Sequence, residues 1–236
     1  MGARAVITID GPAGAGKSTV ARLLARSLGY IYLDSGALYR AVAWQASLLG
    51  LDLGGSQALS RFLADFQPVV TADARGFHLL INGQEVTQEL RAAWVSQAAS
   101  KVAVLPVVRQ WVKERLRHLA QNGGVVAEGR DQGSVVFPQA RYKFYLDAAL
   151  ATRAARRRQD WQGAGDPPTL EEIMAEVAAR DLQDETRADG PLTVPPGAIR
   201  IDTTDLSIDE VVRQCLDRIT ASSEPGQLAP KPSKPV

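Results

Sequence analysis

The sequence predicts an α/β fold in which helices flank a doubly wound parallel sheet of five strands. Short apolar runs that suit strands begin near Ala5, Tyr30, Val125, Lys143 and Ile199. Helical patterns alternate with these runs, and the first run leads directly into a glycine-rich loop. The chain of 236 residues is long enough to bury such a core. In a sheet of this kind, ligands bind at the carboxyl ends of the strands.

The first strand and the loop after it form the most specific motif in the chain. Residues 5–9 are apolar and rich in β-branched side chains, as expected for a strand buried on both faces. A loop with the spacing G-x-x-x-x-G-K-S follows, and a helical pattern begins at once. This context is the one that a phosphate-binding P-loop requires. The loop residues are Gly11, Pro12, Ala13, Gly14, Ala15, Gly16, Lys17, Ser18 and Thr19.

The P-loop predicts binding of a nucleoside triphosphate with Mg²⁺. Its glycines allow backbone N–H groups to point inward, and the dipole of the following helix favours an anion there. We expect Lys17 to reach the β- and γ-phosphates and the Ser18 hydroxyl to bind Mg²⁺. A dinucleotide-binding loop is disfavoured, because the glycines do not follow the spacing G-x-G-x-x-G.

The rest of the chain continues the alternation of strands and helices. Strands are predicted at 30–33, 125–127, 143–146 and 199–202, and helices at 37–49, 57–65, 106–121, 149–161, 169–185 and from about 207 onward. Two of the helices open with a capping pattern, Thr169 with Glu172 and Ser207 with Glu210. The Pro-, Ser- and Lys-rich segment 221–236 lacks periodicity, and we expect a disordered tail there.

A small insertion interrupts this alternation. Residues 69–71, 77–81 and 84–86 alternate like strands, with a strong turn signal at Asn82-Gly83, and a helical stretch at 90–104 follows. We therefore assign 65–100 to an inserted subdomain and 1–64 with 101–220 to the core domain.

Composition narrows the class of protein. The formal charge of +1 gives no sign of a nucleic-acid or membrane partner, and Cys215 alone permits no disulfide framework. We see no signal peptide before the first strand and no apolar stretch of bilayer length, so we expect a cytoplasmic protein. Nothing in the sequence indicates an obligate interface, and we expect a monomer.

Charged side chains collect where the predicted strands end. Asp10 lies beside the P-loop, Asp34 and Ser35 follow the second strand, and Glu128 to Asp131 follow the third strand of the core. Since these carboxyl ends meet at one edge of the sheet, we expect a second substrate to bind there.

Arginines form a further cluster in the helix predicted at 149–161. Arg153, Arg156 and Arg157 are spaced i, i+3 and i+4, so they share a helical face, whereas Arg158 is expected to be solvated. Beside a P-loop, such guanidinium groups suit the charge that accumulates during phosphoryl transfer. Because that chemistry must exclude water, we interpret about 153–168 as an Arg-rich lid.

Six stretches resemble the bacterial cytidylate kinases, a family of P-loop nucleoside monophosphate kinases. They are IDGPAGAGKST (9–19), LDSGALYR (33–40), AASKVA (98–103), EGRDQGSVVFP (128–138), the ARD…DETRA region (179–188) and IDTTDLSIDEVV (201–212). The resemblance implies transfer of the γ-phosphoryl group of ATP to CMP or dCMP. It also implies that 65–100 belongs to an enlarged monophosphate-binding domain.

The resemblance also implies a role for individual residues. Ser100, Arg109 and Asp131 would bind the cytosine, Ser35 and Asp184 the sugar, and Arg40 and Arg130 the acceptor phosphate, with Tyr39 nearby. Arg157, Arg180 and Arg187 would bridge towards the ATP phosphates, and Thr203 and Thr204 would lie on the adenine side. Lys17, Arg130, Arg157, Arg180 and Arg187 are thus the expected catalytic residues. Gln132 stands where the family more often has an apolar residue, and a contact of Glu128 with Mg²⁺ stays open.

The chemistry of cytosine agrees with these roles. Its N4 amino group donates to a carboxylate or hydroxyl, and its N3 and O2 atoms accept from an arginine. Uracil would place a carbonyl opposite Asp131, which leaves polar groups unpaired. No general base is assigned, because the acceptor is already a phosphate oxygen.

Three alternatives stay open on the sequence alone. A P-loop kinase for UMP, AMP or shikimate is the nearest, although no second acidic residue follows Asp34 as a shikimate kinase would require. A GTP-dependent switch would favour an N-K-x-D motif, which the sequence lacks. RNA binding by the face of Arg153–Arg158 is disfavoured by the near-neutral charge.

Overall fold

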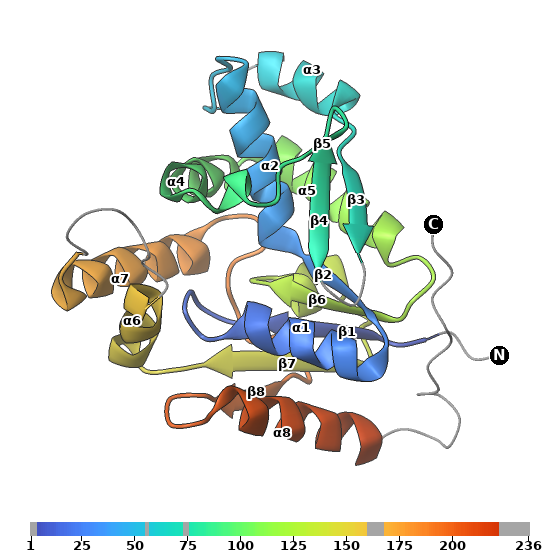
Figure 1. The fold of residues 1–236 in the computed structure, drawn as a ribbon, viewed down its shortest axis with the longest axis vertical. Helices are drawn as coiled ribbons and strands as arrows, with labels where there is room; N and C mark the ends of the chain where they lie inside the picture. The colour runs from blue at the N-terminus through green and yellow to red at the C-terminus, as the bar shows by residue number, and fades with distance from the viewer. Residues whose placement is uncertain (1–3, 55–56, 73–75, 160–167, 222–236) are drawn as a thin grey trace.

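A five-stranded sheet forms the centre of the computed structural model, which describes residues 4–54, 57–72, 76–159 and 168–221. Its strands are β1 (Val6–Asp10), β2 (Ile31–Asp34), β6 (Val125–Gly129), β7 (Tyr142–Asp147) and β8 (Ile199–Asp202). They run in the order β2–β6–β1–β7–β8, and every pair is parallel (Figure 1). The predicted doubly wound parallel sheet is therefore confirmed.

Helices cover the sheet and extend away from it. They are α1 (Lys17–Leu28), α2 (Ser35–Leu48), α3 (Gln57–Asp65), α4 (Ala93–Val102), α5 (Pro106–Leu119), α6 (Leu150–Gln159), α7 (Leu170–Thr186) and α8 (Ile208–Ala221). Helix α1 packs on the sheet beside α8, while α6 and α7 pack against each other at the carboxyl ends of the strands (Figure 1). These ends are also where β1 leads into the P-loop.

The predicted insertion contains a separate antiparallel sheet. Strands β3 (Val69–Ala72), β4 (Phe77–Ile81) and β5 (Gln84–Glu85) pair in sequence order, and Asn82 adopts a positive φ of 52° in the turn between β4 and β5. Helix α4 of the insertion packs against α2, which lies outside it. The buried side chains of Leu79 and Val95 belong to the same hydrophobic cluster as Ile7 in β1. One continuous core thus joins the insertion to the main sheet.

Some local structure differs from the sequence-based prediction. The helical stretch expected at 90–104 is divided into a short 3₁₀ turn, η1 (Glu89–Arg91), and α4, because Ala92 between them adopts an extended conformation. A π-helical turn, η2 (Gln132–Val136), follows β6 and was not predicted. Of the predicted lid, residues 160–167 lie outside the described part of the chain, as do residues 222–236 of the predicted tail.

Candidate active site

The P-loop joins β1 to α1 with the backbone geometry that its glycines permit. Gly11, Gly14 and Gly16 have φ values of 145°, 78° and 86°, a region that other residues rarely adopt. A Cβ atom at Gly11 would lie only 2.0 Å from the backbone oxygen of Leu146 in β7, so this position also requires the absence of a side chain. The loop ends at Lys17, the first residue of α1, so the N-terminus of that helix forms part of the anion site.

Lys17 is the central cation of this loop. Its side chain is buried, and its Nζ atom donates a hydrogen bond to the backbone oxygen of Pro12 at 2.7 Å. Among the described residues, it forms no ion pair. Burial, reinforced by the nearby positive charge of Arg130, lowers the pKa of Lys17 to about 7. Lys17 therefore lacks a fixed counter-ion, as expected for a residue that binds a phosphate group.

A hydroxyl and a carboxylate lie side by side next to Lys17. The Ser18 hydroxyl donates to Oε1 of Glu128 at 2.7 Å, and the Tyr32 hydroxyl donates to the same oxygen at 3.2 Å. Burial raises the pKa of Glu128, and the nearby Asp34 carboxylate adds to this rise. Mg²⁺ prefers oxygen ligands and usually binds one or two protein groups together with phosphate oxygens and water. The oxygen atoms of Ser18 and Glu128 fit this requirement.

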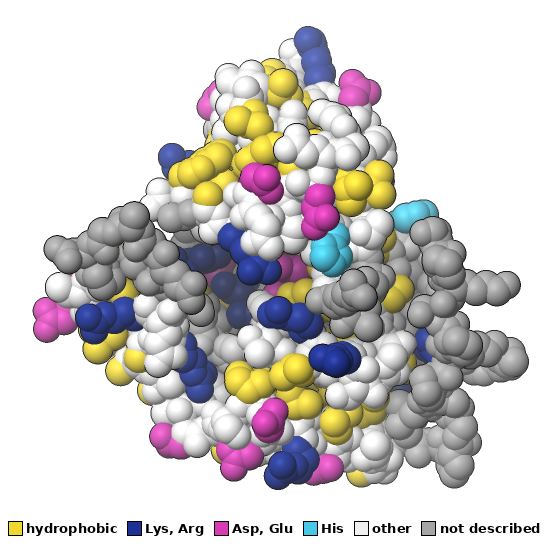
Figure 2. Space-filling model, viewed as in Figure 1, with side chains coloured by type: hydrophobic (Ala, Val, Ile, Leu, Met, Phe, Trp, Pro, Cys, Tyr) yellow, Lys and Arg dark blue, Asp and Glu magenta, His cyan; other side chains and the backbone are white. Residues whose placement is uncertain are grey.

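These groups open onto a cleft between the sheet edge, the α6–α7 pair and the helices α2 and α4. Figure 2 shows a hollow there in which Lys and Arg side chains gather. The predicted site residues that line the cleft are Ala13, Gly14, Lys17, Ser18, Ser35, Tyr39, Arg40, Ser100, Arg130, Asp131, Arg157, Arg180, Asp184 and Arg187. The structure thus brings together predicted site residues from the P-loop, the segment 35–40, Ser100, the segment 130–131 and the two helices α6 and α7 with the residue after them.

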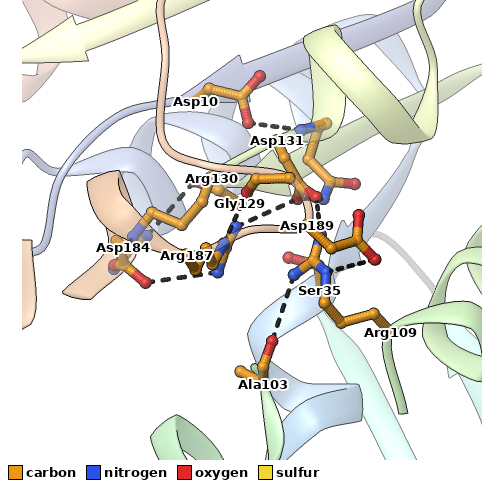
Figure 3. A network of polar contacts seen from close by, with 12 residues as sticks. Asp10, Ser35, Ala103, Arg109, Gly129, Arg130, Asp131, Asp184, Arg187 and Asp189 are labelled. Carbon is orange, nitrogen blue, oxygen red and sulfur yellow. Dashed lines mark hydrogen bonds and ion pairs between the residues drawn. The ribbon is translucent and has the colours of Figure 1, made fainter. Parts of the chain in front are cut away.

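Arginines and carboxylates on the far side of the cleft form a network (Figure 3). Arg130 pairs with Asp184 at 2.6 Å, and Arg187 contacts Asp184 at 3.4 Å and Asp131 at 3.9 Å. Although burial opposes the change, these arginines lower the pKa of Asp184. Burial lowers the pKa of Arg180 to about 10. The network therefore holds several cations in fixed positions, of which most already have a carboxylate partner.

Arg109 lies behind Asp131 and not on the wall of the cleft. Its side chain is completely buried, and its guanidinium forms ion pairs with Asp131 and, at 3.1 Å, with Asp189. It also donates to the Tyr39 hydroxyl at 3.3 Å. A further hydrogen bond runs from Arg109 to the backbone oxygen of Ala103 at 3.4 Å (Figure 3). In this arrangement Arg109 orients the carboxylate of Asp131, and Asp131 itself faces the cleft.

Asp10 connects the end of β1 to the segment that carries Asp131. Its two carboxylate oxygens accept hydrogen bonds from the backbone N–H groups of Gln132 and Gly133, each at 2.7 Å (Figure 3). Burial raises the pKa of Asp10 to about 7, although these two hydrogen bonds favour its charged form. Asp10 therefore fixes the backbone of η2 relative to the start of the P-loop.

Other predicted residues lie outside the cleft. Thr203 is buried, accepts a hydrogen bond from Arg156 at 3.0 Å and donates to the backbone oxygen of Asp147 at 3.0 Å. The Thr204 hydroxyl donates to Asp202 at 2.6 Å. Thr203 still lies close to the P-loop, 3.4 Å from the backbone oxygen of Ala15, and its proximity to adenine stays a prediction.

The prediction of one functional arginine face in α6 was partly wrong. Arg153 is buried and paired with Asp181, and Arg156 holds Thr203, so only Arg157 of the three lines the cleft. Spacings of three and four residues leave the side chains on a broad face, whose two sides pack against different neighbours. Arg158 is exposed, as expected.

Sequence reasoning missed several residues of this region. Asp181 and Asp189 are the partners of Arg153 and Arg109, and Ser96 and Gln183 line the cleft. Asp181 lies inside the stretch 179–188 that was singled out for its resemblance, although no role was assigned to it. Asp189 follows a helix end and gave none.

Comparison with known proteins places these features in a family. The family model for cytidylate kinase matches residues 7–221. The cytidylate kinase of Geobacillus kaustophilus is 43% identical over 92% of this chain and 97% of its own length. Those of Pelotomaculum thermopropionicum and Pseudomonas syringae pv. tomato are each 44% identical over 91% of this chain and cover 96% and 94% of their own lengths. The chain belongs to the cytidylate kinase family.

Proposed function

We propose that this protein transfers the γ-phosphoryl group of ATP to CMP or dCMP, giving ADP and the corresponding diphosphate. The observation that carries this proposal is the position of Asp131 and its neighbouring arginines in the same cleft as Lys17. Family membership, with relatives named cytidylate kinase, supports the choice of acceptor.

On the donor side, the P-loop binds the triphosphate. Backbone N–H groups of residues 14–18 would point to the β-phosphate, and Lys17 would neutralise the β- and γ-phosphates. Since Lys17 is buried and has a lowered pKa, a bound phosphate restores the environment in which the charged amine is stable.

Ser18 and Glu128 are the residues that would hold Mg²⁺. Bound there with the nucleotide, the ion would neutralise charge on the phosphate oxygens. Tyr32 fixes Oε1 of Glu128 through its hydroxyl, and this contact keeps the carboxylate next to Ser18.

On the acceptor side, Asp131 reads the base. Its carboxylate accepts from the N4 amino group of cytosine, while the same position in uracil carries an acceptor that Asp131 would repel. Arg109 lies behind Asp131 and orients its carboxylate, and Asp189 pairs with the same guanidinium at 3.1 Å. Ser35, Arg40, Arg130 and Asp184 bind the sugar and the phosphate.

The transfer needs positioning and charge neutralisation and no general base. A phosphate oxygen of the acceptor attacks the γ-phosphorus, the bond to the β-phosphate oxygen breaks, and ADP leaves with the electron pair. Arg157, Arg180 and Arg187 come from the α6–α7 side of the cleft and stabilise the transferred group.

We further propose a monomer that acts in the cytoplasm on these small molecules, with no nucleic-acid or membrane partner. The near-neutral charge and the single, buried Cys215 support this view. In the described part of the chain, no helix has both the length and the apolar character needed to cross a bilayer.

A steady-state assay with purified protein, ATP and Mg²⁺ tests the proposal. CMP, dCMP, UMP and AMP are compared as acceptors at equal concentrations, with diphosphate products separated by chromatography. We expect CMP and dCMP to exceed UMP by about 10²-fold or more in kcat/KM, because the discrimination depends on unpaired polar groups. A preference for UMP or AMP, or hydrolysis of ATP without an acceptor, would overturn it.

A further inference from the structure

Ala13 of the P-loop is held by side chains from two helices beyond the sheet. Its backbone N–H donates to Oδ1 of Asp181 in α7 at 3.3 Å, and its backbone oxygen accepts from Nη1 of Arg153 in α6 at 3.1 Å. Arg153 and Asp181 also form a buried ion pair with each other. The Nε atom of Arg153 donates in addition to the backbone oxygen of Ala148 at 2.9 Å. We call Ala13, Arg153 and Asp181 the Ala13 anchor.

Apolar packing reinforces this anchor. Ala13 packs with Ala154, Ile173 and Val177 in a small cluster that is distinct from the main core. At the next residue, a Cβ atom on Gly14 would lie 2.9 Å from Cβ of Arg153, so the loop and α6 are in direct contact. The loop backbone and the α6–α7 pair therefore form one packed unit.

The anchor lies next to cleft residues on both helices. Arg157 follows Arg153 by about one helical turn, and Arg180 precedes Asp181 directly. The orientation of each helix at the anchor thus determines where these two guanidinium groups point. The last turn of α7, which directly follows Asp181, has contacts of its own, since Asp184 pairs with Arg130 at 2.6 Å and Arg187 donates to the backbone oxygen of Gly190 at 2.6 Å.

Charge makes the two anchor side chains unequal. Asp181 places a carboxylate against a loop that must bind a polyanion, and this charge is tolerable only because Arg153 is paired with it. Removing Arg153 leaves a buried, uncompensated negative charge at the phosphate site. Removing the charge of Asp181 leaves a buried cation, which does not repel phosphate.

We propose that Arg153 and Asp181 are positioning residues that hold the P-loop at Ala13 and thereby set the affinity for the triphosphate. Neither side chain needs to touch the nucleotide for this role. The inference rests on the proposed function for the identity of the donor, ATP. We expect the anchor to act mainly on the donor side, because both of its hydrogen bonds to the loop are made at Ala13.

Calorimetric titration of each nucleotide alone tests the proposal. ATP and CMP are titrated separately into the wild type and into Arg153→Met, Asp181→Asn, Arg153→Lys and the double variant Arg153→Met with Asp181→Asn. Arg158→Met, an exposed position on the same helix, is the matched control. Thermal unfolding shows which variants are folded at the temperature of the titration.

We expect Arg153→Met to weaken ATP binding by about 10- to 100-fold, since a small displacement of a phosphate-binding loop has effects of this size. Asp181→Asn should weaken it less, and the double variant should bind ATP more tightly than Arg153→Met alone. Arg153→Lys should recover part of the loss, because it restores the charge without the full set of hydrogen bonds. CMP affinity should stay within about twofold in every variant, and Arg158→Met should resemble the wild type.

Equal weakening of ATP and CMP, or unchanged ATP affinity in folded Arg153→Met, would overturn the proposal. If Arg153→Met does not fold, Asp181→Asn decides by the same criterion. Failure of the proposed function is distinguishable, because it would appear as absent transfer to CMP by the wild type. The ATP titrations need no acceptor and would keep their meaning in that case.

Discussion

The two sides of the cleft present their positive charges in different ways. On the donor side, Lys17 is buried, and burial lowers its pKa to about 7. On the acceptor side, Arg130 and Arg109 are held by Asp184 and by Asp131 with Asp189. Lys17 on the donor side therefore depends on its ligand for a counter-ion, whereas the arginines of the acceptor side already have carboxylate partners before a ligand binds.

The two sides of the cleft therefore suit different tasks, namely binding of a triphosphate and recognition of a base. A triphosphate carries several negative charges and can be bound by backbone N–H groups together with one cation. Discrimination of cytosine from uracil depends on one amino group, and it requires a carboxylate whose position and charge are fixed in advance. The paired arginines provide that fixed geometry at the cost of a weaker attraction for anions.

Replacing Lys17 should have the largest effect. Lys17→Met should reduce kcat/KM for ATP by about 10³-fold, because it removes the main cation at the transferring phosphate. The fold should be retained, since the Lys17 side chain hydrogen-bonds, within the described part of the chain, to the Pro12 backbone oxygen alone. Steady-state kinetics and far-UV circular dichroism measure both properties. Wild-type turnover in this variant would show that the loop has another role.

Replacing Asp131 should change selectivity on the acceptor side. Asp131→Asn offers an amide that can donate to the uracil carbonyl, so the ratio of kcat/KM for CMP over UMP should fall by about 10²-fold or more. KM for ATP should change little. Competition assays with both acceptors in one reaction give the ratio directly, and an unchanged ratio would remove Asp131 from base recognition.

The roles of Lys17 and Asp131 were predicted from different kinds of sequence information. The role of Lys17 follows from local motif spacing, whereas that of Asp131 was implied by the resemblance to a family. The P-loop could be predicted because its geometry depends on residues that are neighbours in the chain and on glycines at defined spacings. The strands were predicted for a similar reason, as apolar runs between turn signals. The break in the stretch 90–104 and the π-helical turn η2 were not, since tertiary packing determines such interruptions.

The pairing of charges could not be predicted from the residues alone. Ala13 and Asp181 are separated by 168 positions in the sequence, and nothing local to either one indicates the other. Arg153 and Arg157 share a predicted face, yet one is buried and the other lines the cleft. Most residues to which the resemblance assigned a role line one cleft. The resemblance did not reveal that Arg109 lies behind Asp131 and not on the wall of that cleft.

The pH dependence of binding should also differ between the two sides. Burial lowers the pKa of Lys17 to about 7, and a bound triphosphate favours its protonated form. Above pH 7, binding must take up a proton, so ATP affinity should fall with rising pH by up to about tenfold per unit. Although burial opposes the change, the Asp184 carboxylate raises the pKa of Arg130, which therefore stays protonated, so CMP affinity should be nearly constant.

Titrations of each nucleotide without divalent ions, from about pH 7 to about pH 9, measure these slopes. Lys17→Met serves as the control and should lose the dependence for ATP. An equal slope for both nucleotides would contradict the proposed difference between the two cations.

The smallest effect is expected at Gln132. Its side chain is buried, its Nε2 atom lies 3.4 Å from Oδ1 of Asp131, and its Oε1 atom has no hydrogen-bond partner among the described residues. Gln132→Met removes this unpaired acceptor and should increase the free energy of unfolding by about 1 kcal/mol. The CMP to UMP ratio should change by less than about fivefold, because Arg109 still orients Asp131. Chemical denaturation and the competition assay test these two expectations, and a large loss of selectivity would assign Gln132 a direct role.

The most direct test of the division between the two sides is a crossed measurement of dissociation constants. ATP and CMP are each titrated into Lys17→Met and Asp131→Asn. We predict that Lys17→Met weakens ATP and leaves CMP within about twofold, while Asp131→Asn does the reverse. If either variant weakened both nucleotides to the same degree, the donor and acceptor sides would not be separate, and the proposed division of the cleft would be contradicted.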